Sequence, residues 1–382
     1  MRRATALLLL ALCASGAMGQ SSFATLSGGP MAEDAVGTIT TGTSFTVGVR
    51  TWSPSVGHGL ELRTFSGSGS PMSTQVVPLP GRILAQGMEP HPAGGSVICG
   101  ARFVNDSTSL DPLLIRLDVA GNVQWTWSPG LPSGQLMRDA VVLTDGSVVL
   151  AGYTGSSEKH NAVVARISAT GQQLWYVELP GPLDEEADAV VADASSVMVT
   201  GRQMNYGGEA DPLFARLDLN GTVLWTTSWG GVRDDAGLDL ARNGAEYVMA
   251  GRTRSHAAYD HSTGTWNEGG YLIAIDQQGD TLWQRTFADT MHHRVLHAIA
   301  IAPNGDLLVA GTEQAVDSGA DAALLMRLTA GGSTLWERRF HLADEERPAQ
   351  VRALPQGMLV CGSAFNASGR QVMLVRTDDN GN

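Results

Sequence analysis

The sequence has little positive charge and almost no lysine. Its 382 residues include 25 lysines and arginines against 38 aspartates and glutamates, so the formal net charge is −13, and Lys159 is the single lysine. Nucleic-acid phosphates bind to basic faces. The composition therefore argues against a nucleic-acid partner.

Cysteine is also scarce, with three residues in the chain. Cys99 and Cys361 fall at one repeat position in units that are not adjacent, so their sulfur atoms are not expected within the about 2 Å of a disulfide. We expect two free, buried thiols that act as small hydrophobic residues. Cys13 is a poor lipoprotein signal, because the residue before it, Leu12, is large.

Long apolar runs are absent after the first twenty residues. Arg2 and Arg3 precede the apolar stretch 6–14, and Ala17-Met18-Gly19 offers a small-x-small cleavage site. Nine apolar residues are too few to span a bilayer. We expect residues 1–19 to be a secretory signal peptide, and the mature protein to be exported without a membrane span.

Charged residues are few at 16%, whereas hydrophobic residues make up 43% of the chain. Such a composition supports a sizeable core and excludes general disorder. Glycine is abundant, with 46 residues, and it lacks the triplet period of collagen. This excess predicts a chain with many tight turns.

An internal repeat organises the chain. LDVAGNVQW at 117–125 returns as ISATGQQLW at 167–175 and as LDLNGTVLW at 217–225. Tryptophans recur at spacings of 50, 50, 58 and 53 residues, at Trp125, Trp175, Trp225, Trp283 and Trp336. A glycine after an apolar run marks seven units, at Gly48, Gly100, Gly152, Gly201, Gly251, Gly311 and Gly362.

Each unit divides into four predicted strands, which in the third unit are 139–143, 147–154, 161–168 and 172–178. An Asp-Gly pair between apolar, β-branched runs is a hairpin signal. The middle strands are apolar without alternation, so both faces of each sheet must be covered. Four-stranded sheets that repeat about every 50 residues predict an all-β fold, a seven-bladed β-propeller of antiparallel blades.

We expect a single domain over residues 20–382, with blades at 31–79, 82–128, 136–179, 185–230, 234–288, 295–341 and 348–382. The seventh unit stops in the turn before its tryptophan strand. Residues 21–29 supply the missing sequence, with Phe23 in the place that Trp225 holds in the fourth unit. The N-terminal strand should therefore complete the last blade, and this pairing removes an exposed sheet edge.

These patterns resemble a known family. The succession Asp-Ala, Asp-Gly, Ala-Gly-x-Thr and Arg-x-Asp-x-x-Gly-x-x-x-Trp is similar to the extracellular bacterial propeller repeats called delta-60 or SBBP repeats, and to the tryptophan-bearing repeats of quinoprotein-like propellers. The resemblance covers residues 21–382. It implies export by a bacterium and specifies no activity.

The fifth unit carries the most distinctive candidate site. Its insertion at 252–271 lengthens the loop between strands two and three, which lies on the same face as the connections between blades. Variable loops are where binding residues are expected. The insertion holds His256, Tyr259, His261 and Trp266, and the next inter-blade loop adds His292 and His293. The functional interpretation is a patch that binds a glycan or a protein partner, with an imidazole metal site as a further alternative. The other interpretation is a surface loop whose aromatic residues pack locally.

Two further features recur and leave alternatives open. Acidic pairs occur near the first strand of several units, at Glu33-Asp34, Glu185-Glu186 with Asp188, Asp234-Asp235 and Glu345-Glu346. They either bind a cation or a basic partner at the mouth of the central channel, or accept hydrogen bonds from neighbouring loops. Arginines recur on the third strand, at Arg63, Arg116, Arg166, Arg216, Arg327 and Arg376, and this repetition favours a scaffold role.

No nucleophile elbow, HExxH motif or phosphate-binding glycine loop is present in the sequence. We therefore expect a non-catalytic binding or scaffold protein, without cofactor or metal and monomeric, at the cell surface or in the extracellular space, with the periplasm as an alternative. The competing hypothesis is a carbohydrate-active or quinone-dependent enzyme that uses the channel mouth on the long-loop face.

Overall fold

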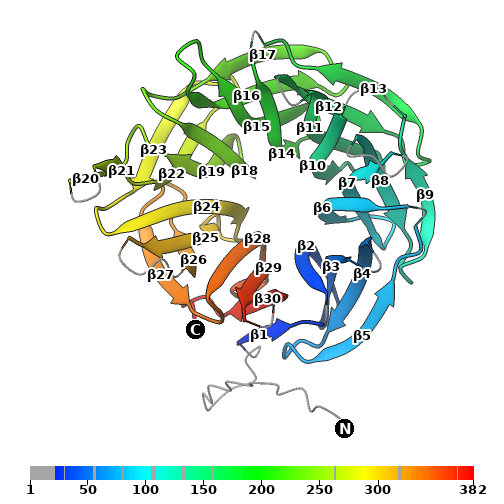
Figure 1. Ribbon diagram of the computed structural model, residues 1–382. Coiled ribbons are helices and arrows are strands. Elements are labelled where there is room, and N and C mark those ends of the chain that lie inside the picture. The colour runs from blue at the N-terminus through cyan, green and yellow to red at the C-terminus, as the bar shows by residue number, and fades with distance from the viewer. Residues whose placement is uncertain are drawn as a thin grey trace.

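The computed structural model describes residues 22–29, 31–54, 57–79, 81–104, 109–130, 134–156, 159–181, 183–261, 264–316, 321–367 and 369–382. Within these ranges, seven four-stranded antiparallel sheets form a ring (Figure 1). This arrangement confirms the predicted seven-bladed β-propeller. The expected signal peptide lies outside the described residues.

The blades are numbered 1 to 7 along the chain, and the bounds of their strands follow. They are β2 (Ala32–Thr41), β3 (Ser44–Ser53), β4 (Gly57–Phe65) and β5 (Pro71–Val76); β6 (Ile83–Pro90), β7 (Ser96–Phe103), β8 (Leu110–Leu117) and β9 (Val123–Trp127); β10 (Gly134–Val142), β11 (Val148–Ser156), β12 (Lys159–Ile167) and β13 (Gln173–Glu178); β14 (Glu185–Ala192), β15 (Ser196–Met204), β16 (Ala210–Asp218) and β17 (Val223–Ser228); β18 (Asp235–Asn243), β19 (Glu246–Thr253), β22 (Gly269–Ile275) and β23 (Thr281–Phe287); β24 (His292–Ile301), β25 (Leu307–Ala315), β26 (Asp321–Leu328) and β27 (Thr334–Phe340); and β28 (Glu345–Ala353), β29 (Met358–Asn366), β30 (Gly369–Thr377) and β1 (Phe23–Ser27). A small hairpin of β20 (Tyr259–Asp260) and β21 (Thr265–Trp266) is inserted in blade 5.

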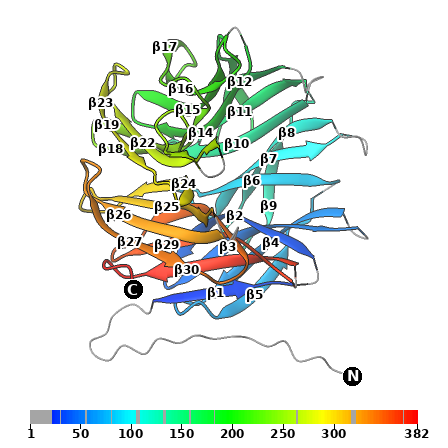
Figure 2. The same ribbon diagram turned by 60° about the vertical axis from the view of Figure 1, so that its left-hand side comes forward.

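The first strand of each blade lies nearest the ring axis and the fourth strand lies outermost (Figures 1 and 2). The burial of the strands follows this order. All seven residues of β22 are buried, whereas the outer strand β23 is largely exposed. The unbroken apolar runs of the middle strands are explained by neighbouring blades that cover both of their faces.

The hydrophobic core is divided among the interfaces between blades. Val149 and Val164 of blade 3, for example, belong to one buried cluster with Val199 and Leu213 of blade 4. The ring must therefore be complete for each blade to have both neighbours.

The N-terminal strand closes the ring, as predicted. Strand β1 pairs antiparallel with β30, with Phe23 opposite Arg376 and Ala24 opposite Val375. The two strands lie side by side although more than 340 residues separate them in the sequence (Figure 2). Blade 7 therefore combines three strands from the end of the chain with one from its beginning.

Each innermost strand carries a β-bulge at one repeat position. The pairing with the second strand skips Val36, Gln86, Arg138, Asp188, Leu238, His297 and Ala349. In six blades the residue before the bulge pairs with the repeat glycine, as Met137 does with Gly152. In blade 1 the residue before the bulge, Ala35, pairs with Val49. Gly48, which the sequence predicted as the repeat glycine of this blade, therefore lies one residue before the equivalent position. Sequence spacing alone does not reveal which residue the bulge skips.

We expect a Gly152→Ala substitution to destabilise the protein by about 2 to 3 kcal/mol, as overpacking of a core does. A Cβ on Gly152 would overlap the backbone carbonyl oxygen of Leu136, which the sheet holds in place. Gly48→Ala is the matched control, because the nearest atom to its new Cβ would be the flexible Met88 Sδ at 2.9 Å. Urea unfolding of both variants measures the difference, and equal losses of stability would contradict this account.

The repeat tryptophans connect each blade to the next one. Four of them donate an indole N–H to a turn carbonyl of the following blade, in the pairs Trp125 with Ala169, Trp175 with Leu219, Trp225 with Gln277 and Trp336 with Asp379. Each of the five rings also packs against the turn glycine of that blade, at Gly171, Gly221, Gly279, Gly332 and Gly381. Phe23 packs in the same way against Gly69 of blade 1.

Several of the recurring arginines reinforce these connections. Arg166, Arg216 and Arg327 donate to the same carbonyl groups as the neighbouring tryptophans, those of Leu219, Gln277 and Asp379. Arg376 likewise reaches the carbonyl group of Gly67 in blade 1. These contacts are structural, which agrees with the argument from repetition. Arg63 differs, since it pairs with the buried Glu33 and Glu61.

Cys99 and Cys361 are buried free thiols in separate clusters. Burial raises the pKa of Cys361 to about 12 and raises that of Cys99 well above its usual range. Both therefore stay protonated and pack as apolar side chains.

Candidate functional site

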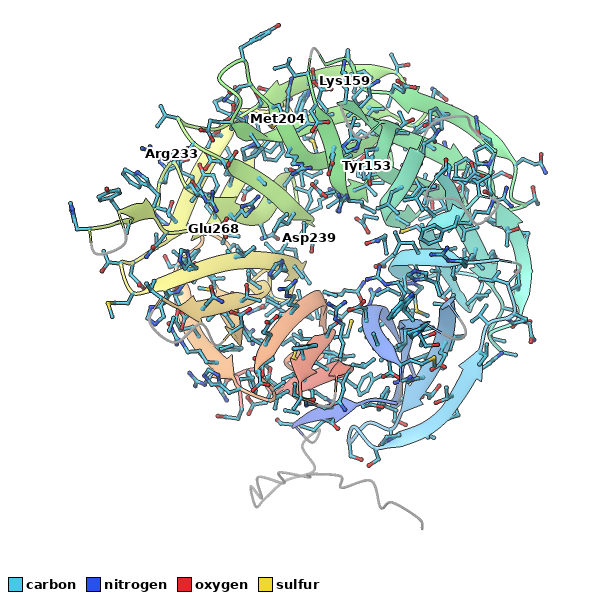
Figure 3. The ribbon with its side chains drawn as sticks, viewed as in Figure 1. Tyr153, Lys159, Met204, Arg233, Asp239 and Glu268 are labelled. Carbon is cyan, nitrogen blue, oxygen red and sulfur yellow. The ribbon has the colours of Figure 1, made fainter. Side chains whose placement is uncertain are left out.

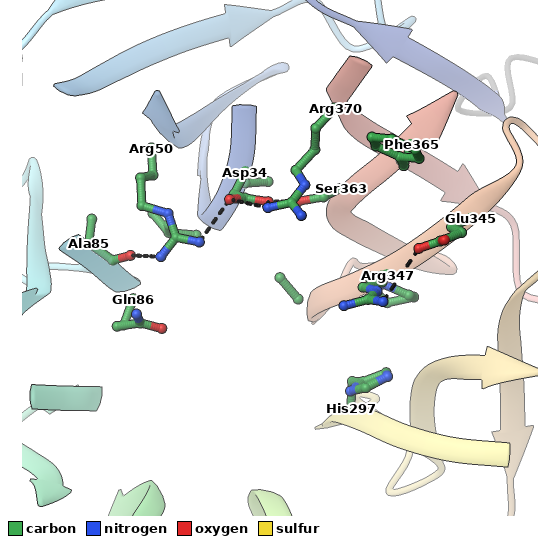
Figure 4. Close-up of a pocket in the computed structure, with 15 residues that line it drawn as sticks. Asp34, Arg50, Ala85, Gln86, His297, Glu345, Arg347, Ser363, Phe365 and Arg370 are labelled. Atoms are coloured by element: carbon green, nitrogen blue, oxygen red, sulfur yellow. Dashed lines mark hydrogen bonds and ion pairs between the residues drawn. The ribbon is translucent and has the colours of Figure 1, made fainter. Parts of the chain in front are cut away.

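A cavity of about 320 Å³ lies near the ring axis, on the face where the innermost strands begin. Blades 1, 2, 6 and 7 contribute to its wall (Figure 4). We call it the axial cavity and define it by Asp34, Arg50, Gln86, His297, Glu345, Arg347, Ser363, Phe365 and Arg370. It is on the long-loop face identified from the sequence.

Asp34 is the centre of the ionic network in this wall. Arg50 Nη2 lies 2.8 Å from Asp34 Oδ2, and Arg370 Nη1 lies 3.1 Å from each carboxylate oxygen (Figure 4). Ser363 donates its hydroxyl to Asp34 Oδ1 at 2.9 Å. Burial would raise the pKa of Asp34, but the two guanidinium groups outweigh it, so the pKa is lowered. The carboxylate stays ionised and is a weak base.

Arg347 is the most accessible positive charge of the axial cavity. Its side chain is 67% exposed and makes one long contact, 3.4 Å, with Glu345. Burial, together with the nearby Arg347, lowers the pKa of His297 to about 4, so the imidazole is neutral at physiological pH. The three arginines against two carboxylates make this region positive in a protein whose total charge is strongly negative.

A second ionic network lies on the opposite side of the axis, at blades 3 and 4. Glu186 pairs with Arg138 and Arg202 at 2.8 Å and receives His160 Nδ1 at 2.8 Å. His160, Asp184 and Glu186 each place one ligand atom within 4.8 Å of the others. A metal ion there would have to displace two guanidinium groups from Glu186, which makes an ion-pair network the better description.

Polar side chains next to the bulges tie three pairs of neighbouring blades together near the axis. Asp139 accepts from Val190 N at 2.9 Å, Asp239 from Ile299 N at 2.7 Å, and Gln350 from Thr38 N at 2.7 Å. Figure 3 shows Asp239 pointing toward the centre of the ring. Burial raises the pKa of Asp239 to about 7 and raises that of Asp139 well above its usual range, with their mutual repulsion adding to the shift of Asp139.

The aromatic residues of the insertion form a cluster at the outer rim of blade 5. The Tyr259 ring lies 5.2 Å from Trp266 and 4.9 Å from His261, and the Arg233 guanidinium lies 4.1 Å above the Trp266 ring. The β20–β21 hairpin holds this cluster at the edge of the ring (Figure 1). Tyr259, His261 and Trp266 are therefore brought together, away from the axial cavity.

The other predicted histidines do not join this cluster. His256 packs on Tyr271, His292 Nδ1 lies 3.0 Å from Asp289, and His293 Nδ1 accepts from Glu268 N at 3.0 Å. The described imidazoles are thus distributed over separate local contacts instead of converging on one point.

The acidic pairs divide between the two alternatives left open above. Buried carboxylates cap loops, since Glu185 accepts from Leu183 N, Asp235 from Gly231 N, and Glu346 from Ala343 N. Asp34 and Glu345 are the members that line the axial cavity, where both lie beside arginines.

Arg50 and Arg370 were not predicted from the sequence as site residues. A usable signal was present for Arg50, because an arginine stands one or two positions after the bulge partner in several units, at Arg50, Arg102, Arg202 and Arg252. No local signal marks Arg370, which meets Asp34 only because the ring closes.

No family model matches the chain. A search of curated proteins finds the regulatory protein FlaEY of Caulobacter vibrioides, 23% identical over 176 residues, a match that covers 38% of this chain and 18% of that protein.

In the described ranges, no helix has the length and apolar character needed to cross a bilayer.

Several solved structures share the fold. A puromycin hydrolase matches with a TM-score of 0.55 at 14% identity, over 91% of this chain and 52% of that chain. The phage phi92 endosialidase matches with a TM-score of 0.53 at 8% identity, over 94% of this chain and 69% of that chain. At these identities the similarity shows a common β-propeller architecture and nothing finer.

Proposed function

We propose that this chain is an exported, non-catalytic propeller that binds an acidic glycan at the axial cavity. The export part rests on the leader at residues 1–19, and the delta-60 or SBBP resemblance of the repeats fits a bacterial extracellular protein. The observation that carries the binding part is the group of three arginines, Arg50, Arg347 and Arg370, around one cavity of an acidic protein.

The chemistry of the cavity suits a carboxylate or sulfate group. Guanidinium groups bind such oxyanions through paired, charge-assisted hydrogen bonds. Arg347 offers the most exposed donors, and Gln86 adds an amide in the same wall. An anionic group that enters the cavity would meet this local excess of positive charge, which attracts it.

Two exposed aromatic side chains suit the sugar ring that would carry the anion. Phe365, which lines the cavity, is 47% exposed, and Trp52, two residues after Arg50 on β3, is 43% exposed. Aromatic faces offer flat apolar surface, while the polar groups beside them fix the orientation of a ligand. The β20–β21 hairpin, with Tyr259 and Trp266, would extend the contact surface for a longer glycan on the same face.

The hydroxyl and imidazole of the cavity favour binding over catalysis. Ser363 donates to Asp34, whose pKa is lowered by its two arginines, so this pair lacks the basic partner that a serine nucleophile requires. His297, although neutral, faces Thr312 Oγ1 at 3.2 Å instead of Ser363.

We expect an Arg347→Ala variant of the mature protein to bind acidic glycans about tenfold more weakly, the loss typical of one hydrogen bond to a charged group. Arg347 is largely exposed, so its removal should leave the fold intact. A glycan array with uronic-acid, sialylated, sulfated and neutral members identifies the ligand, and titration of the best one gives the ratio. Arg242→Ala is the matched control, since Arg242 is also exposed. It lies at the end of β18 in blade 5, on the tight-turn face and therefore away from the axial cavity.

Equal retention of neutral and acidic glycans would contradict this proposal, as would unchanged affinity in Arg347→Ala. Retention of an acidic protein segment in place of any glycan would indicate a protein partner. Release of reducing sugar from the retained glycan would instead favour the carbohydrate-active enzyme.

A further inference from the structure

The interface between blades 1 and 2 lacks the aromatic ring found at the other six interfaces. In blade 3 the pair next to the outer bulge is Arg166 and Trp175, and the corresponding pair in blade 1 is Thr64 and Ser73. Both of the large side chains that bridge to the following blade are therefore replaced by small hydroxyl residues.

A cavity of about 400 Å³ occupies this interface, a volume within the range of small-molecule sites. Leu62, Thr64, Ser73 and Gln75 of blade 1 line one side, and Val119 and Gly121 of blade 2 line the other. It lies on the tight-turn face, away from the axial cavity, so it is independent of the function proposed above. We call it the indole slot.

The fold already shapes this slot for a flat ring. Gly121 has a φ of +79° and occupies the turn position that faces a tryptophan or Phe23 at each other interface. Leu62 Cδ1 and Gln75 Oε1 lie 2.8 and 2.7 Å from where a Cβ on Gly121 would stand, so these two side chains cover the glycine as closely as the tryptophan rings cover the equivalent glycines. A ring that stacks over Gly121 therefore has to displace the flexible Gln75 side chain. Leu62 supplies apolar contact and Val119, 82% exposed, forms an apolar lip.

The slot also presents a hydrogen-bond acceptor in the expected place. Val119 is the turn residue equivalent to Ala169 and Leu219, whose carbonyl groups accept the indole N–H of Trp125 and Trp175. Among the described residues, none donates a side-chain hydrogen bond to the Val119 carbonyl oxygen. Thr64 and Thr46 bond to each other instead, with 3.2 Å between their hydroxyl oxygens.

We propose that the indole slot binds an aromatic ring of about indole size that carries an N–H donor. The ring would stack over Gly121 and donate to the Val119 carbonyl, in the place that the protein's own tryptophans hold at four other interfaces. The ligand class is thus defined by occupants of equivalent positions in the same chain.

The test uses the mature protein with 5-fluoroindole, followed by ¹⁹F NMR line broadening and titration. We expect saturable binding that is lost in Ser73→Trp, in which the protein's own indole fills the slot, together with a rise in the melting temperature of that variant. Ser73→Phe is a second filled variant, because a phenyl ring occupies the equivalent site in blade 7. Ser228→Trp, at an exposed position on β17 outside any slot, is the matched control and should bind normally.

Two further measurements make the prediction specific. Benzofuran, which has the shape of indole without its N–H, should bind about fivefold more weakly, as the loss of one neutral hydrogen bond implies. Trp175→Ser should create a second slot between blades 3 and 4 and double the number of bound 5-fluoroindole molecules. Undiminished 5-fluoroindole binding in Ser73→Trp and Ser73→Phe would overturn the proposal, as would no binding to the unmodified protein.

The natural ring could belong to a free compound or to a tryptophan side chain of a partner, and one comparison separates them. N-acetyltryptophanamide that competes as well as indole would identify a peptide tryptophan as the ligand. Competition by indole alone would identify a free aromatic compound.

Discussion

Deletion of residues 1–30 is expected to abolish the folded monomer. The deletion removes β1, so β30 loses its five paired residues and blade 7 keeps only three strands. It also removes Phe23, whose ring packs on Phe45 and on the Gly69 turn of blade 1. Phe23 is partly buried, so its loss should cost less than the about 3 to 5 kcal/mol of a fully buried phenylalanine. The unpaired edge of β30 also invites association between chains. Size-exclusion chromatography and thermal unfolding would show aggregates or a markedly lower melting temperature.

A rearranged chain provides the matched control for this deletion. The C-terminal residues Asp378 to Gly381 form the turn that precedes the fourth strand in other blades. If residues 21–29 follow Asn382 directly, Phe23 stands four positions after Gly381, as Trp175 does after Gly171. This rearranged chain should fold as a monomer with near-normal stability. Failure of the rearranged chain, or normal folding of the deleted one, would contradict the role given to the closing strand.

The fold was predictable because its determinants are repeated. Seven copies of one pattern predicted the number of blades. The last copy lacks its tryptophan strand, which predicted that the strand containing Phe23 pairs with the last blade. The prediction was wrong by one residue in blade 1. Gly48 and Arg63 each lie one residue away from the positions that the glycine and the arginine hold in the other units, because the bulge at Val36 sets which residues pair. The degenerate sequence of this blade is also what opens the indole slot.

The candidate site was less predictable, because its contacts arise from ring closure. Asp34 and Arg370 meet across blades 1 and 7, although 336 residues separate them in the chain. Tyr259 and Trp266, predicted from the insertion, do cluster, since they lie on one short hairpin. A local pattern in the sequence thus located a local cluster, whereas the axial cavity forms only when the whole ring closes.

The unfolding free energy is expected to fall as the pH rises from about 4 to about 8, and Asp239→Asn should reduce this fall. Burial raises the pKa of Asp239 from 3.8 to about 7 in the folded state. The protonated carboxyl is therefore favoured by folding, and its contribution is complete below pH 4 and is lost as the pH rises through about 7. A shift of this size corresponds to at most about 4 kcal/mol, and to less where water in the ring reaches the carboxyl. Asp188, whose pKa burial raises to about 6, acts in the same direction.

Below about pH 4, the dependence of the unfolding free energy on pH should be controlled by other groups. Burial opposes ionisation of Asp34, Glu186 and Glu313, but their arginine partners outweigh it and lower the pKa of each, so these groups stabilise the fold above their unfolded pKa values and lose that effect in acid. Stability should therefore be greatest near pH 4 to 5. Urea unfolding between pH 3 and 8 measures the profile, with Asp280→Asn on an exposed turn as control. If Asp239→Asn and Asp280→Asn leave equal slopes above pH 5, Asp239 is not the group that titrates. A flatter slope in Asp239→Asn alone would show that the carboxyl joining blades 5 and 6 is held protonated, and that the blade contacts near the axis weaken when it ionises.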